Sequence, residues 1–241
     1  MRFNVYVLDQ AESIKSSEVR KMVRAVKAQV KDDFCPAWDM KADVLYAKSL
    51  EKLDPKNVDA LVYLKDKVKD ADYAGYHDKD ARTGVSLGYV FFDVSDSLEE
   101  DVSVTLSHEI LEILGNRHVN YYALGPHPTK ERIVFHWLEM CDAVQANSYK
   151  KEGVLVSDFL LPTYFTSDKE VREKNHFLSG KLESFGVMPG GYVGFFDPKT
   201  GRDSNFFSDK LSKERFKIKG RLGKLRRRER IANEFKKMGK I

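Results

Sequence analysis

The sequence has little cysteine: Cys35 and Cys141 are the only two in 241 residues. Two cysteines give no disulfide framework of the kind that stabilises small secreted proteins, so we expect free thiols and a reducing compartment. The chain also lacks a run of eighteen apolar residues, and therefore a membrane-spanning helix. Its first residues, Met1 to Asp9, lack the charged and then apolar composition of a secretory signal. These absences predict a cytoplasmic protein with no signal peptide and no membrane contact.

Repeats of the length found in solenoids and propellers are also missing from the sequence. The chain does contain 42% hydrophobic and 12% aromatic residues, enough to bury a large core. We therefore expect one large globular domain, or one domain with an appendage.

Positive charge is concentrated at the C-terminal end. Residues 209–241 hold fourteen of the 41 basic residues and only four of the 37 acidic ones, so the rest of the chain is acidic, with 27 against 33. We predict a main domain over residues 1–205 and a basic helical tail over residues 206–241. Two roles are open for this tail: a solvated helix docked on the acidic body, or a contact to nucleic acid, since clustered positive charge suffices for phosphate binding.

Residue spacing gives an α+β pattern. A helix is expected over residues 13–33, with Ser13 as its N-cap and Pro36 after its end. Residues 66–83 and 116–130 are expected to be loops, and residues 133–146 fit either a helix or a turn. A hairpin around residues 193–196 is expected to finish the domain. Strands are predicted over residues 3–8, 42–47, 60–64, 85–94 and 154–156.

The segment Ser107-His108-Glu109-Ile110-Leu111-Glu112 is the most informative. We expect it in a helix that begins near residues 96–97 and has His108 and Glu112 one turn apart on one face, with Glu109 beside them. The remaining sides of this helix are apolar, which predicts burial. Unpaired buried charges would cost roughly several kcal/mol each, and a bound metal cation is the simplest partner for a histidine and a carboxylate at this spacing.

This pattern resembles the H-E-x-x-H helix of zincin metallopeptidases, with Glu112 in place of the second histidine. The longer metzincin form is matched at His108, Glu109, Gly115 and His118. Wider similarity, over about residues 1–195, is to zincin-like proteins with H-E-x-x-E helices from bacteria and tailed phages. Its segments are Gly75-Tyr76-His77-Asp78, Leu138-Glu139-Met140-Cys141-Asp142 and Val156-Ser157-Asp158-Phe159.

The resemblance implies a zincin-like domain, in which a twisted mixed sheet packs on two helices and the second helix carries the metal. The implied metal ligands are His108 and Glu112, with Glu139 or His118 as the third. Zinc is the first choice of metal, although one histidine and two carboxylates also suit calcium or manganese. Glu109 is then the general base of a peptidase-like hydrolase acting on a peptide or protein.

Further roles follow from the same resemblance. Asp142 would orient His108 through its second ring nitrogen, and Gly115 would end the helix in a left-handed conformation and turn His118 toward the metal. Met140 would form either a methionine turn or core packing. The strand at residues 85–94 would lie at the sheet edge and pair with substrate, with Gly88 allowing close backbone approach.

A different class of function is also compatible with the sequence. Because Glu112 replaces a histidine, the protein could be a catalytically inactive zincin-shaped binding or structural protein, for example a phage virion component whose basic tail contacts nucleic acid or a partner.

Overall fold

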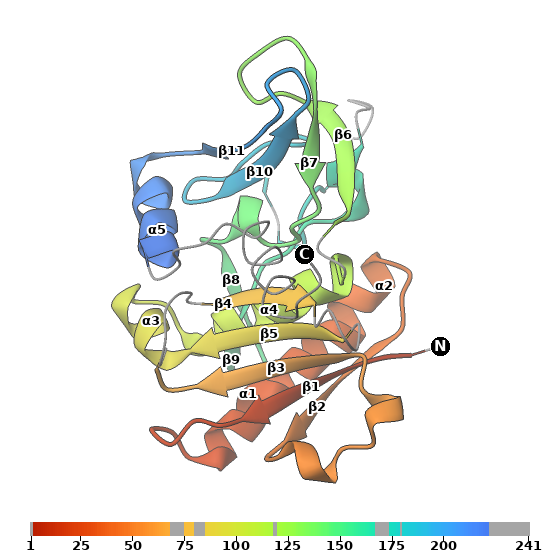
Figure 1. The fold of residues 1–241 in the computed structure, drawn as a ribbon, viewed down its shortest axis with the longest axis vertical. Coiled ribbons are helices and arrows are strands. Elements are labelled where there is room, and N and C mark those ends of the chain that lie inside the picture. The colour runs from red at the N-terminus through yellow and green to blue at the C-terminus, as the bar shows by residue number, and fades with distance from the viewer. Residues whose placement is uncertain are drawn as a thin grey trace, which may run out of the picture.

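The computed structural model describes residues 2–67, 75–79, 85–117, 120–166, 174–178 and 180–221. Its first half is built on a five-stranded sheet of order β2-β1-β3-β5-β4 (Figure 1). The strands are β1 (Phe3–Asp9), β2 (Ala42–Ala47), β3 (Ala60–Lys65), β4 (Gly75–Lys79) and β5 (Ser86–Phe91). All neighbours pair in parallel except β4, which is antiparallel to β5.

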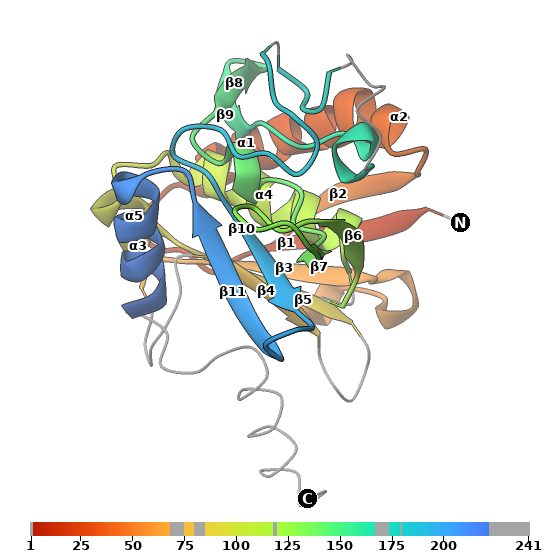
Figure 2. The same ribbon diagram turned by 90° about the horizontal axis from the view of Figure 1, so that it is seen from above.

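Two helices, α1 (Ser16–Gln29) and α4 (Val102–Gly115), lie against the same face of this sheet (Figure 2). The predicted helical spacing in α1 is confirmed, because Val19, Met22, Val23 and Val26 are buried. The predicted cap is wrong: Lys15 occupies the N-cap position, and the hydroxyl of Ser13 donates to the carboxylate of Asp66 instead. The helix continues as a π-helix, η1 (Val30–Phe34), and then α2 (Cys35–Ala37).

The edge of the sheet differs from the prediction. Residues 66–83 were expected to form a loop, but they contain β4, which is the edge strand. The strand expected at the edge, β5, lies between β3 and β4. Gly88 in β5 lies against α4, because a Cβ at this residue would be 3.0 Å from Ile113 of α4 and 3.1 Å from Val62 of β3. Its lack of a side chain lets α4 pack closely on the sheet.

The segment expected to form one helix from residues 96–97 is split in two. α3 (Phe92–Ser97) follows β5 directly, and α4 begins after a break at residues 98–101. Asp101 is the N-cap of α4, and its carboxylate accepts a hydrogen bond of 3.0 Å from the backbone N–H of Ser103. A capped start fixes where α4 begins and therefore where His108 and Glu112 point.

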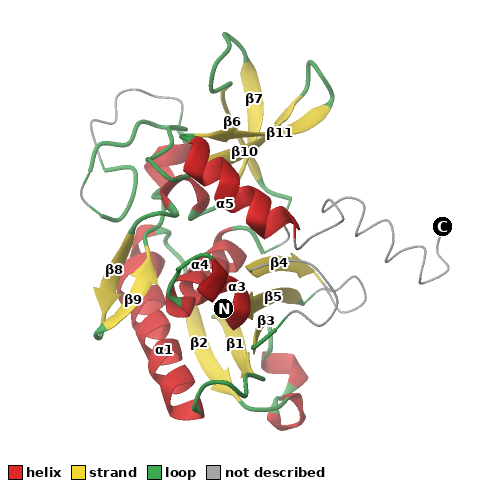
Figure 3. Ribbon diagram, turned by 90° about the vertical axis from the view of Figure 1, so that its left-hand side faces the viewer, coloured by secondary structure: helices red, strands yellow, loops and turns green. Residues whose placement is uncertain are grey.

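A second sheet forms the other half of the molecule, drawn at the top of Figure 1 and Figure 3. It is antiparallel, of order β11-β10-β7-β6. Residues 133–146 form neither a continuous helix nor only a turn, because they begin with β7 and end with the short 3-10 helix η4 (Asp142–Val144). The hairpin expected around residues 193–196 is confirmed as β10–β11. The strands are β6 (Tyr122–Pro126), β7 (Ile133–Trp137), β10 (Tyr192–Asp197) and β11 (Arg202–Phe207).

A small hairpin of β8 (Ser148–Lys151) and β9 (Val154–Ser157) packs against α4 and α1 (Figure 3). The turn η5 (Pro162–Phe165) follows it. The loop predicted over residues 116–130 is wrong in part, since it contains β6. The α+β class is confirmed.

The last described helix, α5 (Lys210–Arg221), is docked on the body of the protein. Phe216 packs edge-to-face on Tyr192 and Phe207, and Arg215 approaches Glu100 at 3.5 Å. The rest of the predicted basic tail, residues 222–241, lies outside the described residues. Cys35 and Cys141 are buried free thiols. None of the helices in the described ranges is long and apolar enough to cross a membrane.

Candidate metal centre

His108, Glu112 and Asp142 meet at one point between the two halves of the molecule. Nε2 of His108 lies 3.1 Å from Oε1 of Glu112 and 3.5 Å from Oδ1 of Asp142. One ligand atom from each residue lies within 4.8 Å of the other two. The first two residues come from successive turns of α4, and Asp142 begins η4. Two elements that are distant in sequence thus build one cluster.

Gly115 and Met140 hold these two elements together. Met140 is fully buried and packs against the C-terminal end of α4. A Cβ on Gly115 would lie 2.6 Å from the sulfur of Met140. Gly115 is not among the residues with positive φ, so the predicted left-handed conformation is wrong. The glycine instead makes room for Met140. The backbone oxygen of Met140 accepts a 2.7 Å hydrogen bond from the N–H of Leu160, which fixes the turn leading to Asp142.

The cluster is shielded from water. His108 is 8% exposed, Glu112 5% and Asp142 7%. Burial by itself lowers the pKa of His108, but the carboxylates of Glu112 and Asp142 more than offset this, and the pKa lies well above its usual value. Burial and the charge of Glu112 raise the pKa of Asp142. Two carboxyl groups therefore share one imidazole in a place where charge is poorly hydrated.

Tyr192 completes the surroundings of Asp142. Its hydroxyl donates a hydrogen bond to the Asp142 carboxylate, and burial together with the nearby charges of Asp142 and Glu112 raises the pKa of the phenol well above its usual value. The ring of Tyr192 is held in turn by Phe207 and Phe216. The phenol therefore stays protonated and positions Asp142.

The donor set fits a divalent metal ion. Zinc bonds of about 2.0–2.2 Å in a tetrahedral site place neighbouring ligand atoms about 3.3–3.6 Å apart. The separations of 3.1 and 3.5 Å around His108 are close to that spacing. One imidazole nitrogen and two carboxylates suit zinc and also the harder manganese and calcium ions.

The structure brings together two of the predicted ligands, His108 and Glu112. Asp142 was expected at the second ring nitrogen of His108, but it faces Nε2, the same atom that faces Glu112, and so it belongs to the cluster itself. Glu139 is not in this three-residue group and lines the pocket beside Asp142. His118 lies outside the described residues. The roles of His118 and Glu139 as possible third metal ligands stay predictions.

Glu109, the predicted general base, is buried next to His108 in α4 and is 6% exposed. Its negative charge contributes, after those of Glu112 and Asp142, to the raised pKa of His108. The side chains of His77 and Asp78, which belong to one of the resembling segments, lie outside the described ones.

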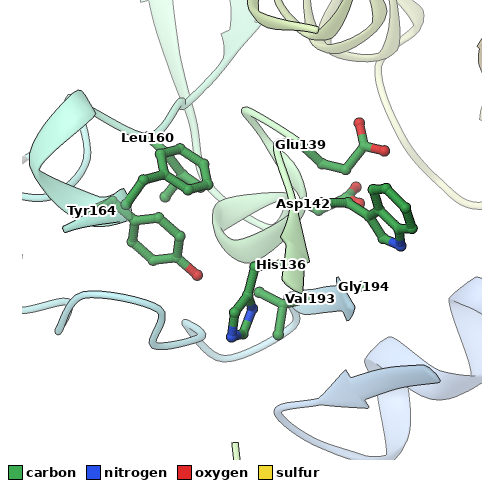
Figure 4. A pocket seen from close by; sticks show the side chains of 9 residues that line it. His136, Glu139, Asp142, Leu160, Tyr164, Val193 and Gly194 are labelled. Atoms are coloured by element: carbon green, nitrogen blue, oxygen red, sulfur yellow. The ribbon is translucent and has the colours of Figure 1, made fainter. Parts of the chain in front are cut away.

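A pocket opens beside the cluster and shares Asp142 with it (Figure 4). The cavity itself is only about 10 Å³, which is room for about one water molecule. Figure 4 shows the carboxyl groups of Glu139 and Asp142 on one side, with Leu160 and Tyr164 on the other. The walls are otherwise largely apolar and aromatic: Trp137, Phe165 and Val193 complete them together with His136 and Gly194. The cavity is therefore too small for a substrate side chain unless its walls move.

No family model matches this chain, and no curated protein or solved structure shows significant similarity to it.

Tyr192 is the residue of the site that sequence reasoning missed. It follows the glycine turn at residues 189–191 and carries no motif that links it to Asp142. It reaches the cluster because hydrogen bonds from Met188 N–H to the Ala143 carbonyl and from the Gln145 side chain to the Gly190 carbonyl hold the preceding turn against η4. Asp142 was recognised from the family-like segment, but its position relative to His108 depends on how η4 packs below α4.

Proposed function

We propose that this protein is a zincin-like, metal-dependent hydrolase that cleaves peptide bonds. The observation that carries this proposal is the buried cluster of His108, Glu112 and Asp142, with donor atoms 3.1 and 3.5 Å apart and an apolar pocket beside it. Glu109 follows His108 on the same helix, as the resemblance to the H-E-x-x-H pattern implies.

The architecture supports the zincin-like proposal. A mixed sheet packs on two helices, and the second of them, α4, carries His108, Glu109 and Glu112. A turn below this helix, with Met140 as its buried residue, supplies the third member of the cluster. The resemblance implied the sheet, the two helices and the place of His108 and Glu112, and it left Met140 either as a methionine turn or as core packing. Asp142 joins the cluster in addition to the predicted ligands, and the third ligand, Glu139 or His118, stays a prediction.

When bound, zinc supplies Lewis acidity toward a water molecule and a substrate carbonyl. His108, Glu112 and Asp142 hold the ion in this proposal. Glu109 accepts the proton of the attacking water while the water oxygen bonds to the carbonyl carbon. Glu109 then returns that proton to the nitrogen as the C–N bond breaks, leaving a carboxylic acid and an amine. Tyr192 keeps Asp142 oriented throughout.

The negative charge of the cluster affects how fast a bound metal ion could promote hydrolysis. Two carboxylates donate more negative charge than the two histidines of an H-E-x-x-H site, so the ion is a weaker Lewis acid. We therefore expect slower turnover than in such enzymes.

Glu109→Gln tests the mechanism. The variant keeps its shape and its metal content, but it should cleave a peptide library at least about a hundredfold more slowly, since the general base is lost. Glu131→Gln, in an exposed turn, is the matched control and should cleave like the parent. Equal cleavage by Glu109→Gln and the parent would refute the assigned role.

The second candidate function is nucleic-acid binding through α5, with a structural metal or no metal. Its support is the arrangement of α5: Ser212 is buried and Phe216 is docked, whereas Lys210, Lys213 and Lys217 are exposed on one side. Changing the three lysines to glutamine should reduce the slope of log affinity against log salt for DNA by up to about 3. An unchanged slope would exclude α5 as the contact. These substitutions leave Phe216 in place, unlike a deletion of the tail.

A further inference from the structure

One face of the second sheet carries large apolar side chains that are open to solvent. Directly paired residues of neighbouring strands lie on the same face, and the register pairs Tyr122 with Trp137, and Leu124 with Phe135. Tyr122 is 53% exposed, Leu124 57% and Ile133 59%. We call this the apolar face of the sheet and define it by six residues: Tyr122, Leu124, Ile133, Phe135, Trp137 and Phe196.

The opposite face of the same sheet is covered by the protein's own core. Val134, His136, Val193 and Phe195 are buried on that side, and the ring of His136 lies 4.7 Å from that of Phe185. The side chains of the apolar face therefore do not contribute to packing in the core. Of the six large hydrophobic side chains that are exposed in the described part of the chain, three lie on it. A gathered group of this kind marks an interaction site, unlike the same number of scattered residues.

The apolar face is continuous with the pocket beside the metal cluster. Trp137 belongs to both, since it lines that pocket together with Asp142. Gly194 of β10 allows this, because a Cβ there would lie 3.3 Å from the Trp137 ring. From Trp137 the face follows β7 to Ile133, about 13 Å away at the rise of a strand. It therefore begins at the cluster and extends outward by the length of about four extended residues.

The shape and charge of the apolar face select its occupant. Tyr122 meets Phe135 at 84° and Trp137 at 85°, so the rings do not present one flat platform on which bases or sugars could stack. The branched aliphatic side chains of Leu124 and Ile133 project from the same face and make it uneven. Asp203, paired with Phe196 on the same side, and Glu139 at the pocket would repel a phosphate backbone. Hollows between rings and branched aliphatics instead suit the side chains of a polypeptide.

We propose that the apolar face is a docking surface for an extended, apolar segment of the polypeptide substrate, located a few residues from the bond to be cleaved. Alternate side chains of an extended segment point the same way, so every second residue of the substrate contacts the face. This inference rests on the proposed hydrolase function, and it names the class of substrate: unfolded or extended protein with alternating apolar residues.

The test measures binding in the full chain with Glu109→Gln, so that nothing is cleaved. The probes are short fluorescein-labelled peptides in which every second residue is Leu or Phe, and matched peptides with Ser at those positions. We expect the apolar peptides alone to bind, by fluorescence anisotropy. Adding Leu124→Ser with Ile133→Ser should weaken this binding roughly tenfold or more, because two buried aliphatic contacts are lost. Leu50→Ser with Leu211→Ser is the matched control, since these leucines are 48% and 59% exposed elsewhere, and it should leave binding unchanged.

Three results would overturn the inference. Peptide binding could be absent or equal in the two double variants. Sedimentation could show a dimer that Leu124→Ser with Ile133→Ser dissociates, in which case a second copy occupies the face. Oligothymidylate could bind there in place of peptide. Failure of the hydrolase proposal is distinguishable, since peptide binding without any cleavage by the parent leaves the docking surface in place. With cleavage, the face variants should raise KM for long apolar peptides and leave kcat unchanged.

Discussion

The first prediction is that metal binding competes with a proton on His108. The raised pKa of this residue means that, between pH 5.5 and 6.5, the metal-free protein carries an imidazolium between Glu112 and Asp142, because even the unperturbed value is about 6.5. A metal ligand must be deprotonated, so each bound ion releases that proton. The affinity for zinc should therefore fall about tenfold per unit of pH decrease in this window, or about 1.4 kcal/mol.

The pKa of Asp142 is also raised, by burial and by Glu112. If Asp142 releases a proton as well, the slope of log Kd against pH becomes steeper, between about 1 and 2. Isothermal titration with zinc in two buffers of different ionisation enthalpy counts the protons directly. Glu109→Gln should show the same slope as the parent, since Glu109 is not a ligand in this account. An affinity that does not change between pH 5.5 and 6.5 would refute the placement of His108 at the metal.

The remaining predictions concern the groups that support the site. Tyr192→Phe removes the hydrogen bond to Asp142 and should weaken zinc binding about 10–100-fold in a chelator competition; Tyr149→Phe, whose hydroxyl donates to Asp33 elsewhere, should not. Gly115→Ala places a methyl group against Met140 and should lower the free energy of unfolding by about 1–3 kcal/mol in urea, and an unchanged midpoint would contradict that packing. Asp158→Ala removes the acceptor for His176 at 2.6 Å and for two backbone N–H groups, which should cost about 3–5 kcal/mol in guanidinium denaturation. Asp203→Ala, at an exposed position, should change stability by less than about 0.5 kcal/mol.

Sequence patterns located the elements whose signal is local. β1, β2 and β3 alternate or are rich in branched residues, and α1 and α4 repeat their apolar residues at helical spacing. β4 was missed because its residues are mostly polar, begin with a glycine and follow an aspartate-rich stretch. Its conformation comes from backbone pairing with β5, which no local pattern contains. β6 was missed because it contains Gly125 and Pro126, which are typical of a loop, and β7 pairs both with β6 and with β10 far along the chain.

The site divides in the same way. His108 and Glu112 could be paired from the sequence because four residues of helix fix their relation. The position of Asp142 could not, since it depends on Met140 packing against Gly115 and on the hydrogen bond from Leu160 to Met140. Helix-ending glycines commonly adopt a left-handed conformation, which made the expectation for Gly115 reasonable. In this protein the close packing of Met140 accounts for that glycine.

The most direct test of a metal held by His108, Glu112 and Asp142 is elemental analysis of the full chain after incubation with zinc and removal of the free ion. The account predicts a single tightly held ion per chain in the parent and in Glu109→Gln, and its loss in His108→Ala. Retention of the same metal content by His108→Ala, or a parent protein that binds no zinc, manganese or calcium, would contradict it.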